Sequence, residues 1–324
     1  MNRSSFITSL AAVALTGCAG GPPSDYARLP HPANALTTTV LGDDLYVLGG
    51  HHGGAHASAI EDMDDVFLRL DLTDPGATWE HLEAPGEVVQ QATIFTYAGE
   101  VHRIGGLTST YTSGEDKDLW TLDRHSVFRD GTWVELEPLP ESRASHAIAQ
   151  IGDRVYVMGG WVIEGDPDDF VYVEEFFWKD LGDPDATWQT EEQPFQVRDV
   201  CGGAYGGRAW LLGGMRSGVF PKITRAWDPE TGSWSEGPEL PSQGGLNGFG
   251  CAADANDEAL YLTHRNGTVF SLDDDGWEPV GDMRQPRTFH SVSLRGEHEL
   301  IAVGGSDGDT NGEFDAVESI VLDD

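Results

Sequence analysis

Basic residues are scarce in this chain of 324 residues, which has 19 Lys and Arg against 55 Asp and Glu and a formal net charge of −36. A surface of this sign repels nucleic acid and anionic lipid headgroups, so we expect no nucleic-acid partner. The chain also lacks any window with a sustained helical period, which argues against α/β and helical folds. Its length would suit two average domains, but a continuous repeat favours one large all-β domain.

A hydrophobic run long enough to span a bilayer is also missing. The chain begins MNRSSFITSLAAVALTGCAGG, in which Arg3 precedes a short apolar run that leads into LTGC, ending at Cys18. This order is typical of a signal peptide, and LTGC resembles the lipobox of bacterial lipoproteins. The resemblance implies a signal peptide at 1–17, lipidation of Cys18, a linker at 18–23 and a lipid-anchored protein of the cell envelope, with Ala19 favouring the outer membrane. An ordinary secretory peptide with an incidental Cys is the alternative.

A repeat organises the rest of the sequence. An apolar run that stops at a glycine pair occurs five times, and an eroded sixth copy has His264 and Arg265 in place of the glycines. The copies are LYVLGG (45–50), VHRIGG (101–106), VYVMGG (155–160), AWLLGG (209–214), LYLTHR (260–265) and LIAVGG (300–305). Successive copies are 56, 54, 54, 51 and 40 residues apart. A period of about 50 residues indicates a propeller or another repeat array.

All copies but the last are followed by a tryptophan: Trp79, Trp133, Trp188, Trp234 and Trp277. We predict units of four antiparallel strands, in which an inner strand such as 145–151 turns at Gly152-Asp153 into the run before the glycines, and the Trp begins the fourth strand. The pattern resembles the kelch repeat, most closely in AWDPETGSWSEGPELP (226–241) and in the Arg-x-x-His starts at 143 and 287. The resemblance covers about 300 residues and implies a kelch-type β-propeller.

The two ends of the sequence indicate how the ring closes. After the last glycine pair only one further strand is predicted, at 316–323, whereas 26–30 has the register of a fourth strand without a unit of its own. We therefore predict a six-bladed propeller over 24–324, in which the N-terminal strand completes the last blade and removes two open sheet edges.

In such a blade, the loop into the inner strand and the loop after the glycine pair emerge on the same face, and kelch proteins usually bind ligands there. This places a set of residues around one channel mouth: Asn34, His51, His52, Arg143, Trp161, Arg198, Met215, Arg216, Asn247, Arg287 and Ser306. Arginines in an acidic molecule make a positive site for a carboxylate or another anion. Alternatively, they pair with neighbouring acids, and Trp161 packs instead of stacking on a sugar.

Two loops contain residues that suit a metal ion. His51, His52 and His56 lie in a glycine-rich loop and can bind a transition metal, unless this is only an exposed polar loop. The segment SDGDTNGEFDAVE (306–318) matches the D-x-D-x-[DN]-G calcium loop. Its expected calcium ligands are Asp307, Asp309, Asn311, the carbonyl of Glu313 and Asp315. The ion would pin the closing blade, and a solvated acidic loop is the alternative.

Cys201 and Cys251 fall near the same position of adjacent inner strands. They form a disulfide in an oxidising compartment if their Cα atoms lie within about 7 Å, or otherwise remain two buried thiols.

Two functions remain open. The first is a monomeric binding module whose mouth takes a protein, a glycan or a sugar acid. The second follows from DPxATW (74–79 and 183–188), which resembles kelch-type sialic acid mutarotases of the bacterial periplasm and implies a sugar-acid mutarotase or epimerase, with Glu164 as base and Arg216 as the arginine. No match to that family's catalytic segment surrounds Arg216, so we favour the binding module. The Cys-Tyr pair and copper ligands of a galactose-oxidase-like enzyme have no counterpart, and we expect no copper, nucleotide or flavin.

Overall fold

The computed structural model describes residues 24–54, 57–241, 248–273, 275–307 and 312–322. Within these residues the fold is almost entirely β-structure, and the helical part is two short 3-10 helices, η1 (Ile60–Asp62) and η2 (Pro167–Asp169). None of the described helices is long and apolar enough to cross a membrane. The prediction of an all-β fold is confirmed.

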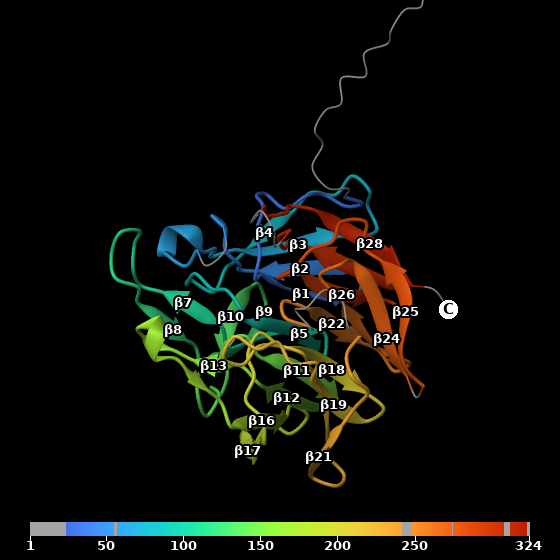
Figure 1. Cartoon of the computed structure of the whole chain (residues 1–324). Coiled ribbons are helices and arrows are strands. Elements are labelled where there is room, and N and C mark those ends of the chain that lie inside the picture. The colour runs from blue at the N-terminus through green and yellow to red at the C-terminus, as the bar shows by residue number, and fades with distance from the viewer. Residues whose placement is uncertain (1–23, 55–56, 242–247, 274, 308–311, 323–324) are drawn as a thin grey trace, which may run out of the picture.

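Six antiparallel sheets follow one another along the described chain and are set around a common centre (Figure 1). The first five have four strands each, and the sixth has three. Sheet 1 contains β1 (Thr37–Leu41), β2 (Asp44–Leu48), β3 (Phe67–Asp71) and β4 (Glu80–Leu82), and sheet 2 contains β5 (Thr93–Tyr97), β6 (Glu100–Ile104), β9 (His125–Arg129) and β10 (Thr132–Glu135). Sheet 3 contains β11 (Ala147–Ile151), β12 (Arg154–Met158), β16 (Glu175–Asp180) and β17 (Gln189–Glu192), and sheet 4 contains β18 (Cys201–Tyr205), β19 (Arg208–Leu212), β20 (Thr224–Asp228) and β21 (Ser233–Glu236). Sheet 5 contains β22 (Ala252–Ala255), β23 (Leu260–Thr263), β24 (Thr268–Asp273) and β25 (Gly276–Asp282), and sheet 6 contains β26 (Ser291–Arg295), β27 (Glu299–Val303) and β28 (Val317–Val321).

The long loops after the second and third glycine pairs contain short strands of their own. β13 (Trp161–Val162) pairs with β15 (Val171–Tyr172) within one loop. β7 (Leu107–Ser109) and β8 (Leu119–Thr121) form a hairpin, and β14 (Glu164–Gly165) adds to β8 from the neighbouring loop. The loops of sheets 2 and 3 are therefore joined by backbone pairing.

The predicted hairpin at the start of each unit is present. In sheet 3, Ile151 pairs with Arg154, which leaves Gly152 and Asp153 as a two-residue turn. Gly152 has φ +56°, a left-handed conformation that two-residue hairpins use and that glycine adopts without strain.

The first strand of every sheet faces the centre. Residues of β1, β5, β11, β18, β22 and β26 together line one central cavity of about 760 Å³. β1 packs beside β5 on one side and beside β26 on the other, so the first and last sheets are neighbours. Figure 1 shows the same relation, with β28 close to β2, β3 and β4.

The core lies between the sheets, because a single four-stranded sheet buries an apolar face only against its neighbour. Phe176 of sheet 3, for example, contacts Trp227 and Trp234 of sheet 4 edge-on. Sheets 1 and 6 share a cluster of the same kind, which includes Leu45 and Ile301, both fully buried. Leu29, from the segment before sheet 1, belongs to this cluster.

The glycine pairs bring neighbouring sheets into backbone contact. Gly50 donates its N–H to the carbonyl of Val89, at the entry to sheet 2, over 2.8 Å. A Cβ atom on Gly49 would lie only 2.1 Å from the same carbonyl oxygen, and Gly49 has φ +59°. The close approach and the left-handed backbone both require glycine at this position.

The fourth-strand tryptophans make a second contact of this kind. Four of them donate the indole N–H to a backbone carbonyl at or just after the end of the fourth strand of the preceding sheet, over 3.0 to 3.3 Å. The pairs are Trp133 with Glu83, Trp188 with Glu137, Trp234 with Glu192, and Trp277 with Pro238.

Residues 24–33 run alongside the start of β28 and the residues just before it. Asp25 donates its N–H to Val317, Leu29 to Asp315 and Ala33 to Phe314, over 2.9 to 3.2 Å. The predicted contact between the N-terminal segment and the last strand is present, but it is not a regular ladder. Pro30 and Pro32 have no N–H to donate, and the Ser24 hydroxyl accepts from the Val317 N–H where a ladder would use a carbonyl.

Candidate functional site

The inner strands are entered through residues with left-handed backbone. These are Ala35, Gln91, Ser145, Asp199 and Phe289, with φ between 52° and 56°, and Gly250 with φ 66° in sheet 5. Backbone hydrogen bonds join several of them across the sheets: Gln91 to Ala35, Ser145 to Gln91, Ala35 to Phe289, and Phe289 to Gly250. Strained conformations of this kind persist only where the surroundings fix them, so the entry face is held rigidly.

The two sets of loops meet on this face. In five of the six sheets, the residue before the left-handed position bridges to the residue after a glycine pair: Asn34 with His51, Gln90 with Leu107, Ala144 with Trp161, Arg198 with Met215, and Thr288 with Ser306. We call this the loop face. Asn247, also expected at the mouth, lies outside the described residues.

Arg143 and Arg287 do not reach the loop face, which corrects their assignment as ligand-binding residues. Each stands one position earlier than Arg198 relative to the left-handed residue, and neighbouring residues of an extended chain point to opposite sides. Both side chains are fully buried between sheets. Arg143 lies over the ring of Phe177 and donates to the Glu175 carbonyl at 2.8 Å, and burial lowers its pKa to about 10.

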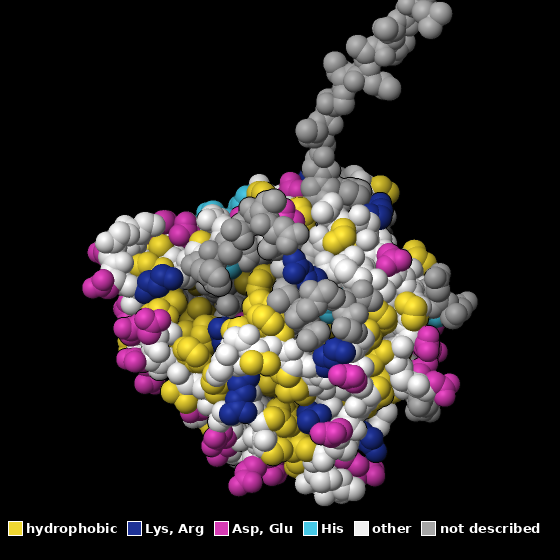
Figure 2. Space-filling view, in the orientation of Figure 1, with side chains coloured by type: hydrophobic (Ala, Val, Ile, Leu, Met, Phe, Trp, Pro, Cys, Tyr) yellow, Lys and Arg dark blue, Asp and Glu magenta, His cyan; other side chains and the backbone are white. Residues whose placement is uncertain are grey.

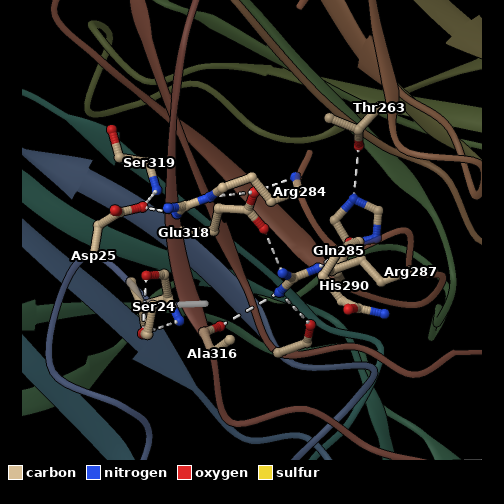
Figure 3. A network of polar contacts seen from close by, with 12 residues as sticks. Ser24, Asp25, Thr263, Arg284, Gln285, Arg287, His290, Ala316, Glu318 and Ser319 are labelled. Carbon is tan, nitrogen blue, oxygen red and sulfur yellow. Dashed lines mark hydrogen bonds and ion pairs between the residues drawn. The ribbon is translucent and has the colours of Figure 1, made fainter. Parts of the chain in front are cut away.

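Arg287 is at the centre of a buried polar network (Figure 3). Its guanidinium donates to the Gly304 carbonyl at 3.1 Å and to the buried carboxylate of Glu318 at 2.6 Å. Arg284 bonds to Glu318 from the other side and also pairs with Asp25 of the N-terminal segment. Through Glu318 and Arg284, this network therefore connects sheet 6 to the start of the chain.

Arg198 does lie on the loop face, stacked on an aromatic ring. Its guanidinium carbon is 3.9 Å from the Trp161 ring centroid, and it pairs with Asp199 at 2.7 Å. Phe170 and Tyr172 extend the aromatic surface from Trp161 by edge-to-face contacts at 5.3 and 5.2 Å. The Trp161 indole N–H has no acceptor among the described residues.

Arg216 joins this group from the next sheet. Its exposed guanidinium donates to Gln196 at 2.9 Å, and the Tyr172 hydroxyl accepts from the N–H of Ser217 at 2.7 Å. The loops of sheets 3 and 4 are thereby held together. We call Trp161, Phe170, Tyr172, Arg198 and Arg216 the aromatic platform.

Glu164 is not part of the platform. It lies in β14, which pairs with β8 of the neighbouring loop, and its partner in register is Trp120. No hydrogen bond or ion pair joins Glu164 to Arg216 within the described residues, and the roles predicted for them as base and arginine of a mutarotase stay a prediction.

The loop face also exposes apolar side chains. Among the described residues, the large hydrophobic side chains that are exposed include Ile60, Trp120, Val171 and Val219, all of them in loops that follow glycine pairs. On the face seen in Figure 2, acidic side chains gather along the rim, whereas Lys and Arg lie further in, among apolar ones.

The histidines after the first glycine pair differ in environment. His51 is buried, and its burial lowers its pKa, whereas the side chain of His52 is 40% exposed. The His52 ring lies beside His31 and Asp64. His56 falls outside the described residues.

The predicted calcium loop is described only at its two ends, because Asp309 and Asn311 lie outside the described residues. Asp307 accepts the N–H of Gly312 at 3.3 Å, which fits a tight turn. The Asp315 carboxylate pairs with Arg28 at 2.5 Å, and that of Glu313 accepts from Asn34 and from the N–H groups of Gly53 and Gly54. Both carboxylates therefore already bind protein donors.

Cys201 and Cys251 are joined by a disulfide, with Cα atoms 6.0 Å apart. The bond links β18 to the residue before β22. It therefore connects the inner strands of sheets 4 and 5.

The central cavity contains polar residues that the sequence reading did not single out. Thr38 bonds to Ser291 and Ser293 across sheets 1 and 6, and Asp254 accepts the N–H groups of Ala255 and Leu294 at 2.8 Å each. Burial raises the pKa of Asp254, and the two amide donors oppose this shift. In the sequence, only the alternation of side chains along the inner strands could have indicated that these polar residues face the cavity.

No model of a known protein family matches the sequence. The chain is 24% identical over 209 residues to Kelch-like protein 35 of Mus musculus, covering 64% of this chain and 31% of that protein. It is 31% identical over 133 residues to Kelch-like protein 36 of Mus musculus, covering 38% and 21%. A third relative is an F-box/kelch-repeat protein of Arabidopsis thaliana, 25% identical over 156 residues and covering 46% and 38%. The chain thus spans less than two fifths of these relatives' length.

Among solved structures, that of YjhT superimposes with a TM-score of 0.70 at 16% identity, covering 93% of this chain and all of the other. At this identity the likeness concerns the fold. The repeated sheets around one cavity define a β-propeller. Together with the relatives, they identify the chain as a kelch-type propeller.

Proposed function

We propose that this protein is a binding module that uses the aromatic platform of its loop face to hold a partner carrying carboxylates, either a protein or a glycan rich in sugar acids. One observation carries the proposal. Arg198 stacks on Trp161, next to Phe170 and Tyr172, and Arg216 lies in the loop that Ser217 joins to Tyr172. Both arginines lie on a face with exposed apolar side chains, in a molecule of net charge −36. Aromatic residues and arginine are the types enriched where binding energy concentrates.

The rigidity of the face supports this proposal. Arg198 is oriented by its stack on Trp161 and by Asp199, and the two loops are joined through Tyr172 and Ser217. A surface that is ordered before binding loses less conformational entropy when a partner docks. Arg216 makes one hydrogen bond to neutral Gln196 and remains exposed, so it can pair with an incoming carboxylate.

An array of glycans and acidic peptides tests the binding function with the purified protein. We expect binding that Arg216→Ala and Trp161→Ala each reduce at least about tenfold, as losses at binding hot spots do. Arg69→Ala, which removes an exposed arginine from β3 that pairs with Glu80, is the matched control and should leave binding unchanged. Ligands that bind the Arg216 and Trp161 variants as well as wild type would refute the platform as the site.

A sugar-acid mutarotase or epimerase is the second candidate, and the notable feature in its favour is the exposed Arg216 on the loop face. Faster anomerisation of N-acetylneuraminate, abolished by Arg216→Ala, would support it. Glu164 pairs with Trp120 in the loop of sheet 2, whereas Arg216 bonds to Gln196 at the entry to sheet 4, so the two candidates are held by different neighbours. No change in anomerisation with any sugar acid would end this alternative.

We further infer that the chain is a lipoprotein of the cell envelope, anchored through Cys18 and active as a monomer. LTGC after a short apolar run supports the anchor, although Cys18 lies outside the described residues. Cys18→Ser should release the protein from the membrane fraction. Continued membrane association of this variant would refute the anchor.

The ring, we infer, has six blades and is closed by the N-terminal segment. The support is that sheets 1 and 6 share an apolar cluster, that Ala35 donates to Phe289 across them, and that residues 24–33 bond to β28. Closure removes the free edge that the three-stranded sheet 6 would otherwise expose.

A further inference from the structure

Three potential metal ligands converge where the N-terminal segment meets sheet 1. His31 comes from the segment itself, His52 from the loop after the first glycine pair, and Asp64 from the run before β3. Asp64 Oδ1 is 3.4 Å from His31 Nε2 and 3.6 Å from His52 Nδ1, and all three ligand atoms lie within 4.8 Å of one another.

The spacing suits one small ion. Two ligand atoms bound at about 2.0–2.1 Å to a tetrahedral zinc ion lie roughly 3.3 Å apart. The two distances to Asp64 are close to this value. Two imidazoles and one carboxylate suit a first-row transition ion, whereas calcium and magnesium prefer oxygen ligands throughout.

These groups lack other partners. The side chain of Asp64 is only 8% exposed, and neither its Oδ2 atom nor Nδ1 of His52 has a hydrogen-bond partner among the described residues. A buried carboxylate oxygen left unpaired is costly. In His31, Nδ1 lies 3.2 Å from the Pro32 carbonyl oxygen, so Nε2, which is directed at Asp64, is the ring nitrogen that can bind an ion.

The backbone around the three ligands is already fixed. His52 donates its N–H to the Asp62 carbonyl at 2.8 Å and Asp64 donates to Gly50 at 3.0 Å. The Glu313 carboxylate holds the N–H groups of Gly53 and Gly54, so the loop that carries His52 is anchored on its other side. A cavity of about 70 Å³, lined by His31, Asp64 and His81, adjoins the cluster. It leaves space for a water or a further ligand on the ion.

We propose that His31, His52 and Asp64 bind a divalent first-row transition metal ion, for which Zn²⁺ is the natural probe. The ion joins the N-terminal segment to the first sheet, so its binding stabilises the folded chain in addition to the backbone bonds of residues 24–33. This site is independent of the aromatic platform, and the two proposals stand or fall separately.

Titration of the metal-free full chain with ZnCl₂, followed by calorimetry, tests the proposal, and the visible absorption of bound Co²⁺ reports nitrogen and oxygen ligation. We expect one ion per chain and a higher melting temperature. His52→Gln and Asp64→Asn should each lower the affinity at least about tenfold, because even groups that only orient a ligand contribute that much. His298→Gln, on an exposed side chain of the β26–β27 hairpin, should bind as wild type does.

His52 is half-exposed, so His52→Gln should fold normally, and its circular dichroism spectrum checks this. If the wild type takes up no Zn²⁺ at micromolar concentration, or if both site variants bind as tightly as His298→Gln, the site does not exist. Equal uptake of Ca²⁺ with the same loss in the variants would also overturn the assignment to a transition metal.

Discussion

Trp79 donates its indole N–H to the backbone carbonyl of Arg28 over 2.8 Å, across 51 residues of sequence. In sheets 2 to 5, the corresponding tryptophan donates to a carbonyl at or just after the end of the fourth strand of the preceding sheet. Arg28 therefore occupies, for sheet 1, the position that such a residue has in the rest of the fold. This equivalence supports the proposal that the segment around Arg28 closes the ring beside sheet 6.

Removing this segment should destabilise the whole molecule. Deletion of residues 19–30 takes away the acceptor of Trp79, the buried Leu29 and the backbone bonds to β28. We expect a clearly lower melting temperature by circular dichroism, because sheet 6 would have a free edge. Deletion of 19–23 alone is the matched control and should melt as the full chain does. A protein without 19–30 that melts at the same temperature would contradict closure by this segment.

The buried pair of Arg287 and Glu318 leads to a second prediction. Arg287→Met leaves the Glu318 carboxylate, 1% exposed, with one of its two arginines, and should lower the free energy of unfolding by about 3 kcal/mol in urea. Adding Glu318→Gln removes the buried charge and should recover part of this loss. Arg69→Met, at a pair that is exposed on both sides, should change stability by at most about 1 kcal/mol. A double variant less stable than Arg287→Met would contradict the charge argument.

Buried His146 should make stability depend on pH. Burial lowers its pKa from 6.5 in the unfolded chain to about 3 in the folded one, so between these values the unfolded state binds the proton more readily. The stability that comes from burying neutral His146 is fully present above pH 6.5 and is lost as the pH falls toward 3. Leu36 occupies the equivalent position in sheet 1, so His146→Leu is a suitable variant. Urea unfolding at pH 7.5 and pH 5 should show that wild type loses more free energy of unfolding on acidification than His146→Leu does. Equal losses would show that His146 does not cause the pH dependence.

The calcium loop stays a prediction from sequence. If 307–315 binds Ca²⁺, calcium should raise the melting temperature of wild type but not of a variant with Asp307→Ala and Asp309→Ala. Asp116→Ala, in an acidic loop of sheet 2, controls for general screening of negative charge. The Asp315 carboxylate pairs with Arg28, so calcium binding would compete with this ion pair at one of the five predicted ligands. Equal shifts in all three proteins, or none, would end the proposal.

The fold could be predicted because its determinants are local and repeated. A two-residue turn such as Gly152-Asp153 and a glycine pair such as 159–160 have the same physical requirement in most copies, so their spacing reveals the unit. The indole acceptors could not be predicted. A carbonyl such as that of Glu83 carries no side-chain signature that distinguishes it from its neighbours.

The candidate site was harder to predict, because it depends on single positions. A shift of one residue separates Arg198, on the loop face, from Arg143, between the sheets, and the repeat alignment did not resolve that shift. The His31, His52 and Asp64 cluster assembles only when the first segment returns to sheet 1. Spacing within one loop, which suggested His51 with His52, could not reveal it.

The contacts of Gly50 with Val89 and of Trp133 with Glu83 share one property: the acceptor is a main-chain oxygen, which every residue possesses. The side chains of the residues that supply these carbonyl oxygens can therefore change during evolution while the hydrogen bonds between neighbouring sheets are kept. This tolerance explains how a chain with 16% identity to YjhT retains the same architecture. Loops between the strands can therefore change in length and sequence while these main-chain contacts between neighbouring sheets are kept.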